Sequence, residues 1–247
     1  MTHQLFLGLA AELAGARPGS VVVLDGDEGR HAATVVRLRP GERYYVADGG
    51  GRRVLAEAEA VDRASVRGRV LEVFDEPEPA TRLVLVQALA KGDRDEQAVE
   101  AATELGVDEV VPWAAERSIV VWRGERAAKS LAKWGAVVTR AAKQSRRARI
   151  PLTSSPVDLT ALVDRVRGAA LALVLHEDAT EPLAGRSLPA AGDVLVVVGP
   201  EGGISTRELE ALVAAGARTV RLGPTILRSS SAGPAALAVL NAASRWR

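Results

Sequence analysis

Three loops that could hold a ligand follow apolar runs in the C-terminal half of this 247-residue sequence. Glycine and proline dominate two of them, "GPEGGIS" (199–205) and "LGPTILR" (222–228), and the third, "LHED" (175–178), is acidic. Glycine lets a ligand approach the main chain closely, and proline stiffens a loop while removing one donor. Because ligands of open α/β sheets bind beyond the carboxyl ends of the strands, these loops predict one site built mostly from main chain.

The loop "GPEGGIS" differs from the known phosphate-binding loops. A P-loop needs the spacing G-x-x-x-x-G-K-[ST], and the dinucleotide fingerprint G-x-G-x-x-G belongs after the first strand of its fold. This loop has no lysine, and Glu201 would repel a phosphate. A neutral or cationic ligand with hydroxyls and amines fits better. The alternative is that the glycines only form turns and that Glu201 favours a helix N-terminus.

Strands that alternate with helices must position these loops. Apolar runs predict strands at 81–90, 108–114, 170–178, 193–203 and 218–227, and helical spacing predicts helices at 94–107, 127–145 and 158–167. Ser205 and Glu208 form an S-x-x-E capping box at the start of a further helix, which Gly216 ends. A last helix is expected to begin near Pro234, because proline suits the first helical turn. The alternation predicts an α/β domain with a largely parallel sheet.

The sequence before residue 75 is typical of short strands and tight turns. Strand candidates lie at 20–24, 43–49, 52–61 and 65–74, and "RPGE" and "DGGGR" supply the turns. The stretch 72–83 carries four acids and two prolines and is expected to be an extended linker. We therefore predict a small β-barrel domain over residues 1–74 and the α/β domain over residues 80–247.

Composition excludes several classes of protein. With 47% hydrophobic and 26% charged residues the chain is expected to be globular, and without cysteine it forms neither disulfides nor thiolate metal sites. Three widely separated histidines argue against zinc, so we expect no metal. The apolar stretch near the N-terminus has no basic residue ahead of it and contains Glu12, which argues against a secretory signal. No run approaches the roughly 20 apolar residues that span a bilayer, so a cytoplasmic protein is expected.

The formal net charge of +1 conceals a basic segment. Through residue 80 the acids outnumber the bases thirteen to ten, whereas residues 129–149 hold seven bases and no acid. Such a run is either the solvated face of a helix or a binding surface for a polyanion. Aromatic residues are too sparse for a base-stacking sheet, so binding of RNA would rest on phosphate contacts and on RNA shape.

Several of these stretches resemble one known family. "VVVGPEGGIS", followed by "VRLGPTILRSSSAGPAALAVL", is similar to the C-terminal signature of the bacterial 16S ribosomal RNA (uracil-N3)-methyltransferases of the SPOUT superfamily. "HAATVVRLRPGE", "ALAKGDRDEQAVEAATELGVDEVVPWAAERS" and "AAKQSRRARIP" resemble further elements of the same family, in the same order. The resemblance covers nearly the full length of the chain.

The resemblance implies a PUA-like β-barrel, which binds RNA, followed by a SPOUT α/β domain whose C-terminal part is threaded into a trefoil knot. It also implies a homodimer with S-adenosylmethionine as the cofactor. The methyl acceptor would be N3 of a specific uridine in the 16S ribosomal RNA of the small ribosomal subunit. Knots are rare in proteins, and nothing in the composition or the periodicity predicts one.

By the same resemblance, three sets of residues form the site. The cofactor is expected to contact Leu175, His176, Glu177, Gly199, Pro200, Glu201, Gly202, Gly203, Leu222, Gly223, Ile226, Leu227, Arg228 and Ser229. Arg228 and Glu201 are the catalytic candidates; a guanidinium can stabilise charge on a carbonyl oxygen but cannot act as the base. RNA is expected to contact Arg37, Arg39, Lys91, Arg117, Arg140, Lys143, Arg146, Arg147 and Arg149.

Three positions depart from the commonest family pattern. Thr225, Ser230 and Ala101 stand where arginine, glutamate and lysine are common, so roles that rest on those side chains do not carry over. The departures leave open a second hypothesis, a non-enzymatic RNA-binding or ribosome-assembly factor on the same fold. A third hypothesis is a nucleotide-dependent enzyme that uses the glycine loops for a phosphate.

Overall fold

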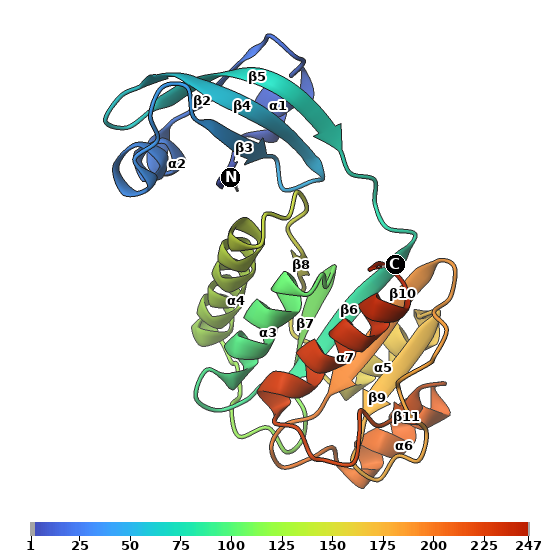
Figure 1. Cartoon of the computed structure of the whole chain (residues 1–247). Coiled ribbons are helices and arrows are strands. Elements are labelled where there is room, and N and C mark those ends of the chain that lie inside the picture. The colour runs from blue at the N-terminus through green and yellow to red at the C-terminus, as the bar shows by residue number, and fades with distance from the viewer. Residues whose placement is uncertain (1–2, 247) are drawn as a thin grey trace. The chain divides into compact units, whose positions relative to one another are not determined.

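The computed structural model describes residues 3–246, and the chain separates into two compact units. The first unit runs up to Glu78 and includes Ala142–Ile150 as well, and the second comprises Pro79–Ala141 and the chain from Pro151 onward. The sequence assigned residues 142–150 to the second domain. Each unit has its own sheet and its own core (Figure 1).

The first unit is built on a five-stranded sheet with the order β1-β3-β4-β5-β2. Its strands are β1 (Leu5–Leu7), β2 (Val21–Leu24), β3 (Arg43–Ala47), β4 (Arg52–Val61) and β5 (Val66–Asp75). β1 pairs parallel with β3, and the other pairs are antiparallel. The four strands predicted in this part of the sequence are confirmed as β2 to β5. Tyr44 and Phe6 lie in its core, where burial raises the pKa of Tyr44 far above its ordinary value.

Short helices complete the first unit. These are α1 (Ala10–Ala14), α2 (Gly26–Arg30) and a π-helical turn at His31–Val36, which ends at Arg37 with a φ of +60°. None of these elements was predicted, because each is too short to show a helical period in the sequence. Leu13 and Ala32 are the residues through which α1 and the π-helical turn enter the core.

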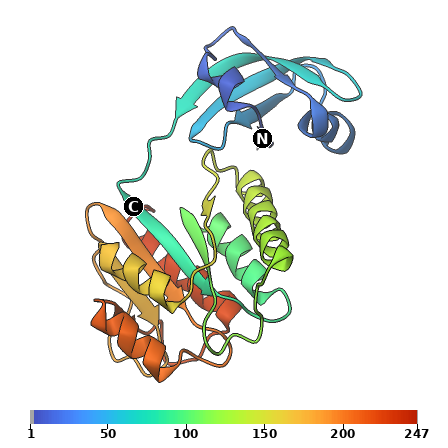
Figure 2. The ribbon, with the colours of Figure 1, turned by 180° about the vertical axis from the view of Figure 1, so that it is seen from behind.

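The second unit has a six-stranded sheet with the order β11-β9-β10-β6-β7-β8, and all of its strand pairs are parallel (Figures 1 and 2). The strands are β6 (Thr81–Ala88), β7 (Glu109–Trp113), β8 (Leu152–Thr153), β9 (Leu171–Leu175), β10 (Gly192–Val198) and β11 (Arg218–Val220). The middle strands β6 and β10 are apolar along most of their length and buried on both faces, as a sheet covered by helices requires. The predicted parallel α/β domain is confirmed.

Helices cover both faces of this sheet. They are α3 (Arg94–Glu104), α4 (Glu125–Gln144), α5 (Leu159–Gly168), α6 (Thr206–Ala214) and α7 (Ser229–Ala243). α3 and α7 pack together over β6 and β10 on one face, and α5 and α6 pack together on the opposite face (Figures 1 and 2). The predicted capping box of α6 is present, with the Ser205 and Glu208 side chains each accepting the other residue's backbone N–H. Among residues 3–246, no helix is both long and apolar enough to cross a membrane.

The start of the last helix was predicted wrongly. α7 begins at Ser229 and not near Pro234, which lies inside the helix. The N–H groups of Ser231 and Ala232 both donate to the Arg228 carbonyl at 2.9 Å, which forms the first turn ahead of the proline. A Cβ on Gly233 would lie 2.7 Å from Cδ1 of Leu85, so a glycine at this position lets the N-terminal part of α7 pack closely on β6.

Candidate active site

A cavity of about 910 Å³ lies at the carboxyl ends of β9 and β10, beside the start of α7. It brings together parts of all three predicted loops. Its lining includes Leu175, His176, Glu177, Gly199, Pro200, Glu201, Gly202, Gly203, Ile226, Leu227, Arg228 and Ser229. Leu222 and Gly223 line an adjoining cavity of about 120 Å³, which shares Leu175 and Ile226 with the larger one.

The loop after β10 is folded tightly against the core of the second unit. Gly203 has a φ of +75°, which favours glycine, and its N–H donates to the Pro200 carbonyl at 2.9 Å. A Cβ on Gly199 would lie 2.6 Å from Cγ1 of Ile204, whose side chain belongs to the buried core. The glycines therefore set the path of the loop and leave its main chain facing the cavity.

Glu201 is held by a cation that the sequence did not point to. Its Oε1 accepts a hydrogen bond from Nη1 of Arg94 at 3.0 Å, and both residues line the cavity. Arg94 is the first residue of α3, and a short loop connects it to the carboxyl end of β6. Because this position lies at the carboxyl ends of the strands, like the three loops, it could have indicated from the sequence that Arg94 belongs to the site.

The turn after β7 also reaches the cavity. Arg117, predicted as an RNA contact, lines the cavity, and its Nη1 donates to the Gly202 carbonyl at 3.1 Å. Its neighbour Glu116 accepts a hydrogen bond from Nε of Arg207 at 2.6 Å. The Ser205 hydroxyl and the Arg207 guanidinium hold the pKa of Glu116 below its ordinary value.

The acidic loop after β9 is held by main-chain hydrogen bonds, one to β11 and one within the loop. The N–H of His176 donates to the Val220 carbonyl at 3.1 Å, and the N–H of Ala179 donates back to the His176 carbonyl. The ring atom Nδ1 of His176 accepts the N–H of Asp178 at 3.2 Å. The three acidic or imidazole side chains of this loop that line the cavity are His176, Glu177 and Asp178.

Arg228 and Ser229 form the third wall, at the start of α7. Arg228 is the N-cap residue of the helix and is exposed toward solvent. The hydroxyl of Ser229 is buried and has no hydrogen-bond partner among residues 3–246. Buried hydroxyls are normally satisfied, so this one is a candidate contact for a polar ligand atom. Catalytic candidates Arg228 and Glu201 thus line one cavity from different loops.

The predicted RNA contacts of the first unit differ in what they touch. Arg37 and Arg39 are exposed just after the π-helical turn. Lys143 is ion-paired with Glu28, and Nη2 of Arg149 donates to the Glu76 carbonyl at 2.7 Å. Arg146 and Arg147 are half-buried in the same segment. Some of the basic side chains of this segment therefore make contacts within the protein.

The predicted RNA contacts of the second unit are surface residues. Lys91 is exposed in the loop between β6 and α3, and Arg140 on α4 lies 3.9 Å from Oε1 of Glu100. Lys133, on the same helix, pairs with Glu96 at 2.6 Å, and this carboxylate raises the pKa of the lysine. The basic face of α4 is thus partly balanced by acids of α3.

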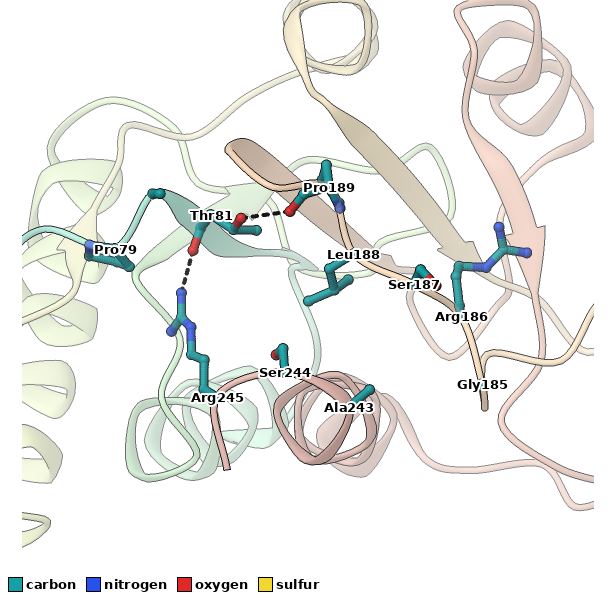
Figure 3. Close-up of a pocket in the computed structure, with 11 residues that line it drawn as sticks. Pro79, Thr81, Gly185, Arg186, Ser187, Leu188, Pro189, Ala243, Ser244 and Arg245 are labelled. Atoms are coloured by element: carbon teal, nitrogen blue, oxygen red, sulfur yellow. Dashed lines mark hydrogen bonds between the residues drawn. The ribbon is translucent and has the colours of Figure 1, made fainter. Parts of the chain in front are cut away.

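A second cavity, of about 520 Å³, lies at the opposite edge of the same sheet (Figure 3). It is lined by the start of β6, the loop ahead of β10 and the end of α7. Thr81 donates to the Pro189 carbonyl at 2.7 Å, and Arg245 donates to the Thr81 carbonyl at 2.6 Å. Because it lies at the amino ends of the strands, it is not where such sheets bind their ligands.

Among residues 3–246, no group of three or more His, Asp or Glu side chains is arranged to hold a metal ion.

Comparison with known proteins identifies similar domains and chains. A family model described as an RNA methyltransferase domain matches residues 76–241, and one described as an RNA methyltransferase PUA domain matches residues 24–71. The ribosomal RNA small subunit methyltransferase E of Mycobacterium tuberculosis is 48% identical over 234 residues, which cover 92% of this chain and 89% of that protein. The protein of the same name from Bacillus subtilis is 28% identical over 226 residues, covering 88% of each.

A solved structure supports the same similarity in three dimensions. It is the ribosomal RNA small subunit methyltransferase E of Neisseria gonorrhoeae, bound to S-adenosyl methionine. It matches this chain with a TM-score of 0.83 and 28% sequence identity, and the match covers 98% of both chains.

Proposed function

The chain belongs to the RNA methyltransferase family, and we propose that it transfers the methyl group of S-adenosylmethionine to N3 of a specific uridine in 16S ribosomal RNA of the small ribosomal subunit. One observation carries the proposal. Twelve of the fourteen residues that the family resemblance assigned to this cofactor, from three separate loops, line one cavity at the carboxyl ends of the parallel strands, and Leu222 and Gly223 line the adjoining one. The relative from Neisseria gonorrhoeae was solved with S-adenosyl methionine bound.

The residues of the cavity fit this cofactor. A volume of about 910 Å³ is large enough for it, since pockets for small molecules and cofactors measure roughly 300–1,000 Å³. S-adenosylmethionine carries hydroxyls, amines and a cationic sulfonium, and it supplies the activated methyl group when bound. The loop carbonyls and N–H groups, the buried Ser229 hydroxyl and the carboxylates Glu177 and Glu201 match those groups.

The side chains of the cavity have distinct roles in the proposed reaction. The imide N–H of uracil is a poor nucleophile until it loses its proton, and negative charge then spreads to the carbonyl oxygens. Arg228 stabilises that charge, because a guanidinium stays protonated and donates to oxygen. Glu201, which is oriented by its hydrogen bond to Arg94, provides negative charge near the cationic sulfonium of the cofactor. Holding the two reactants in line supplies a further part of the rate.

The rest of the chain would bind the RNA and complete the site. We assign the RNA backbone to the basic residues Arg37, Arg39, Lys91, Arg140 and Lys143, together with Arg146, Arg147 and Arg149. The match of residues 24–71 to a PUA domain of RNA methyltransferases supports this role for the first unit. As the family resemblance implies, the C-terminal part would be knotted, two chains would pair as a homodimer, and the enzyme would act in the cytoplasm.

The rival hypothesis of an RNA-binding factor without turnover rests on Thr225 and Ser230. Thr225 lines the smaller cavity, and Ser230 lies in the first turn of α7. The relatives named as methyltransferases support the enzyme over this rival.

The proposal is tested by methyl transfer to ribosomal RNA. Labelled S-adenosylmethionine and the protein are incubated with small ribosomal subunits and, separately, with naked 16S RNA. We expect label in at least one of the two and a stop in reverse transcription at one uridine, because a methyl on N3 blocks base pairing. Arg228→Ala should lose most of the activity, since removing one such donor costs about 10²–10³ in rate. Absence of label from both substrates would contradict the proposal.

A further inference from the structure

The turn after β7 is attached to the glycine loop after β10. The turn spans Ala115–Ser118, and it is closed by the N–H of Ser118, which donates to the Ala115 carbonyl at 3.0 Å. Arg117 donates from Nη1 to the Gly202 carbonyl at 3.1 Å. A Cβ on Gly202 would lie 3.2 Å from Cβ of Arg117, so the two segments are in close contact. The Gly202 carbonyl, in the cavity wall, is therefore oriented by Arg117.

Glu208 connects the same two segments from the buried side. Its Oε2 accepts the N–H of Ser205 at 3.0 Å, which belongs to the capping box of α6. Its Oε1 accepts the N–H of Glu116 at 2.8 Å, from a residue 92 positions away. The side chain is completely buried. A capping box needs only the first of these bonds, so the second goes beyond local helix capping.

The two hydrogen bonds of Glu208 connect the turn after β7 firmly to the start of α6. A buried carboxylate is costly unless hydrogen bonds satisfy its oxygens, and here each oxygen accepts one backbone N–H. The first turn of α6 also favours negative charge. By contrast, the ion pair between Arg207 and Glu116 links the same segments on the surface, where such pairs contribute little.

We propose that Glu208 is a positioning residue for the cofactor cavity. It fixes the main chain of Glu116, and thereby holds Arg117 against the Gly202 carbonyl. Glu208 itself is not among the described residues that line the cavity, and its proposed effect on the ligand runs through Arg117, in addition to its bond to Ser205 in the capping box. This inference rests on the proposed function, since it takes S-adenosylmethionine as the ligand.

Glu208→Gln tests the inference by changing one oxygen to an amide nitrogen. The amide points a donor at one of the two backbone N–H groups, so at least one of the two hydrogen bonds is lost. We expect the Kd for S-adenosylmethionine, measured by calorimetry, to rise about tenfold, the effect of losing one buried hydrogen bond. In the methylation assay the KM for the cofactor should rise similarly, while kcat at saturating cofactor stays within about twofold. Glu210→Gln, an exposed residue of the same helix, is the matched control and should bind like wild type.

Combining the substitution with Arg117→Ala separates positioning from general stabilisation. Arg117 is exposed, so Arg117→Ala is expected to fold and to weaken cofactor binding on its own. If Glu208 acts through Arg117, the double variant binds no more weakly than Arg117→Ala. Multiplication of the two effects would overturn the inference, and so would wild-type affinity in either single variant. Failure of the wild-type protein to bind S-adenosylmethionine would instead overturn the proposed function.

Discussion

Gly199→Ala is predicted to disturb both the fold and the cofactor cavity, because the added Cβ meets a side chain that cannot move freely. That Cβ would lie 2.6 Å from Cγ1 of Ile204 and 3.4 Å from its backbone nitrogen. Ile204 is 7% exposed and packs in the core of the second unit. Overpacking of this kind costs about 1–3 kcal/mol, so we expect the free energy of unfolding to fall by about 2 kcal/mol.

Urea unfolding followed by circular dichroism measures this loss, and calorimetry with S-adenosylmethionine measures the effect on the cavity. We expect weaker cofactor binding, since the loop relieves the overlap by shifting. Gly223→Ala is the control, because a Cβ there has no heavy atom within 4 Å. Its free energy of unfolding should stay within about 0.5 kcal/mol of wild type. If the loop after β11 contacts the cofactor, the same variant still binds it more weakly.

Removing Cγ1 of Ile204, the atom that the new Cβ would overlap, tests whether this overlap causes the loss of stability. Ile204→Ala deletes Cγ1 and is expected to cost about 2–5 kcal/mol by itself, because it leaves a cavity in the core. In the double variant with Gly199→Ala the overlap is gone, so the total loss should be close to that of Ile204→Ala alone. Simple addition of the two losses, or an unchanged stability in Gly199→Ala, would refute the reasoning.

Three further predictions concern stability alone. Burial raises the pKa of Asp95, so the folded chain binds the carboxyl proton more tightly than the unfolded chain does. The folded state therefore loses stability as the pH rises through the ordinary pKa range of Asp, near 4. Asp95→Asn should therefore raise Tm at pH 7, and the gain should vanish in thermal scans below that range. Arg165→Ala removes a 2.7 Å hydrogen bond to the buried Glu109 carboxylate, and the free energy of unfolding measured in urea should fall by about 2 kcal/mol. Arg167→Ala is the control: its ion pair with Asp164 is exposed, so the loss should be less than about 0.5 kcal/mol. Gly135→Ala, in the middle of α4 with nothing within 4 Å of the new Cβ, should stabilise the protein by about 0.5–1 kcal/mol, and an unchanged or lower midpoint would contradict that expectation.

The sequence predicted the elements whose pattern is long and regular. The strands β6, β9 and β10 are largely continuous apolar runs, and the capping box of Ser205 and Glu208 marks the start of α6 on its own. The two-residue strand β8 was not predicted, because it is too short to show a pattern. The short helices between residues 10 and 36 escaped prediction because five or six residues show no period. The start of α7 was predicted wrongly because Pro234 was taken to mark the first turn, whereas the helix begins at Ser229 and contains the proline.

The candidate site was predictable as far as it consists of loops at strand ends. The rule that ligands bind at the carboxyl edge of a parallel sheet is enough to group the three loops, and the family resemblance named their residues. Arg94 and Arg117 reach the cavity from other strands, and their bonds to Glu201 and Gly202 join residues 107 and 85 positions apart. Contacts over such distances depend on the order of strands in the sheet, which the linear pattern does not give.

The position of the new methyl group tests the central claim most directly. The protein, S-adenosylmethionine with a deuterated methyl group, and small ribosomal subunits or 16S RNA are incubated, and the RNA is digested to nucleosides for mass spectrometry. We predict that the label appears in 3-methyluridine, and that Arg228→Ala greatly reduces it while Glu210→Gln does not. Label confined to another nucleoside, or no label with either substrate, would contradict a cavity that delivers a methyl group to N3 of uridine.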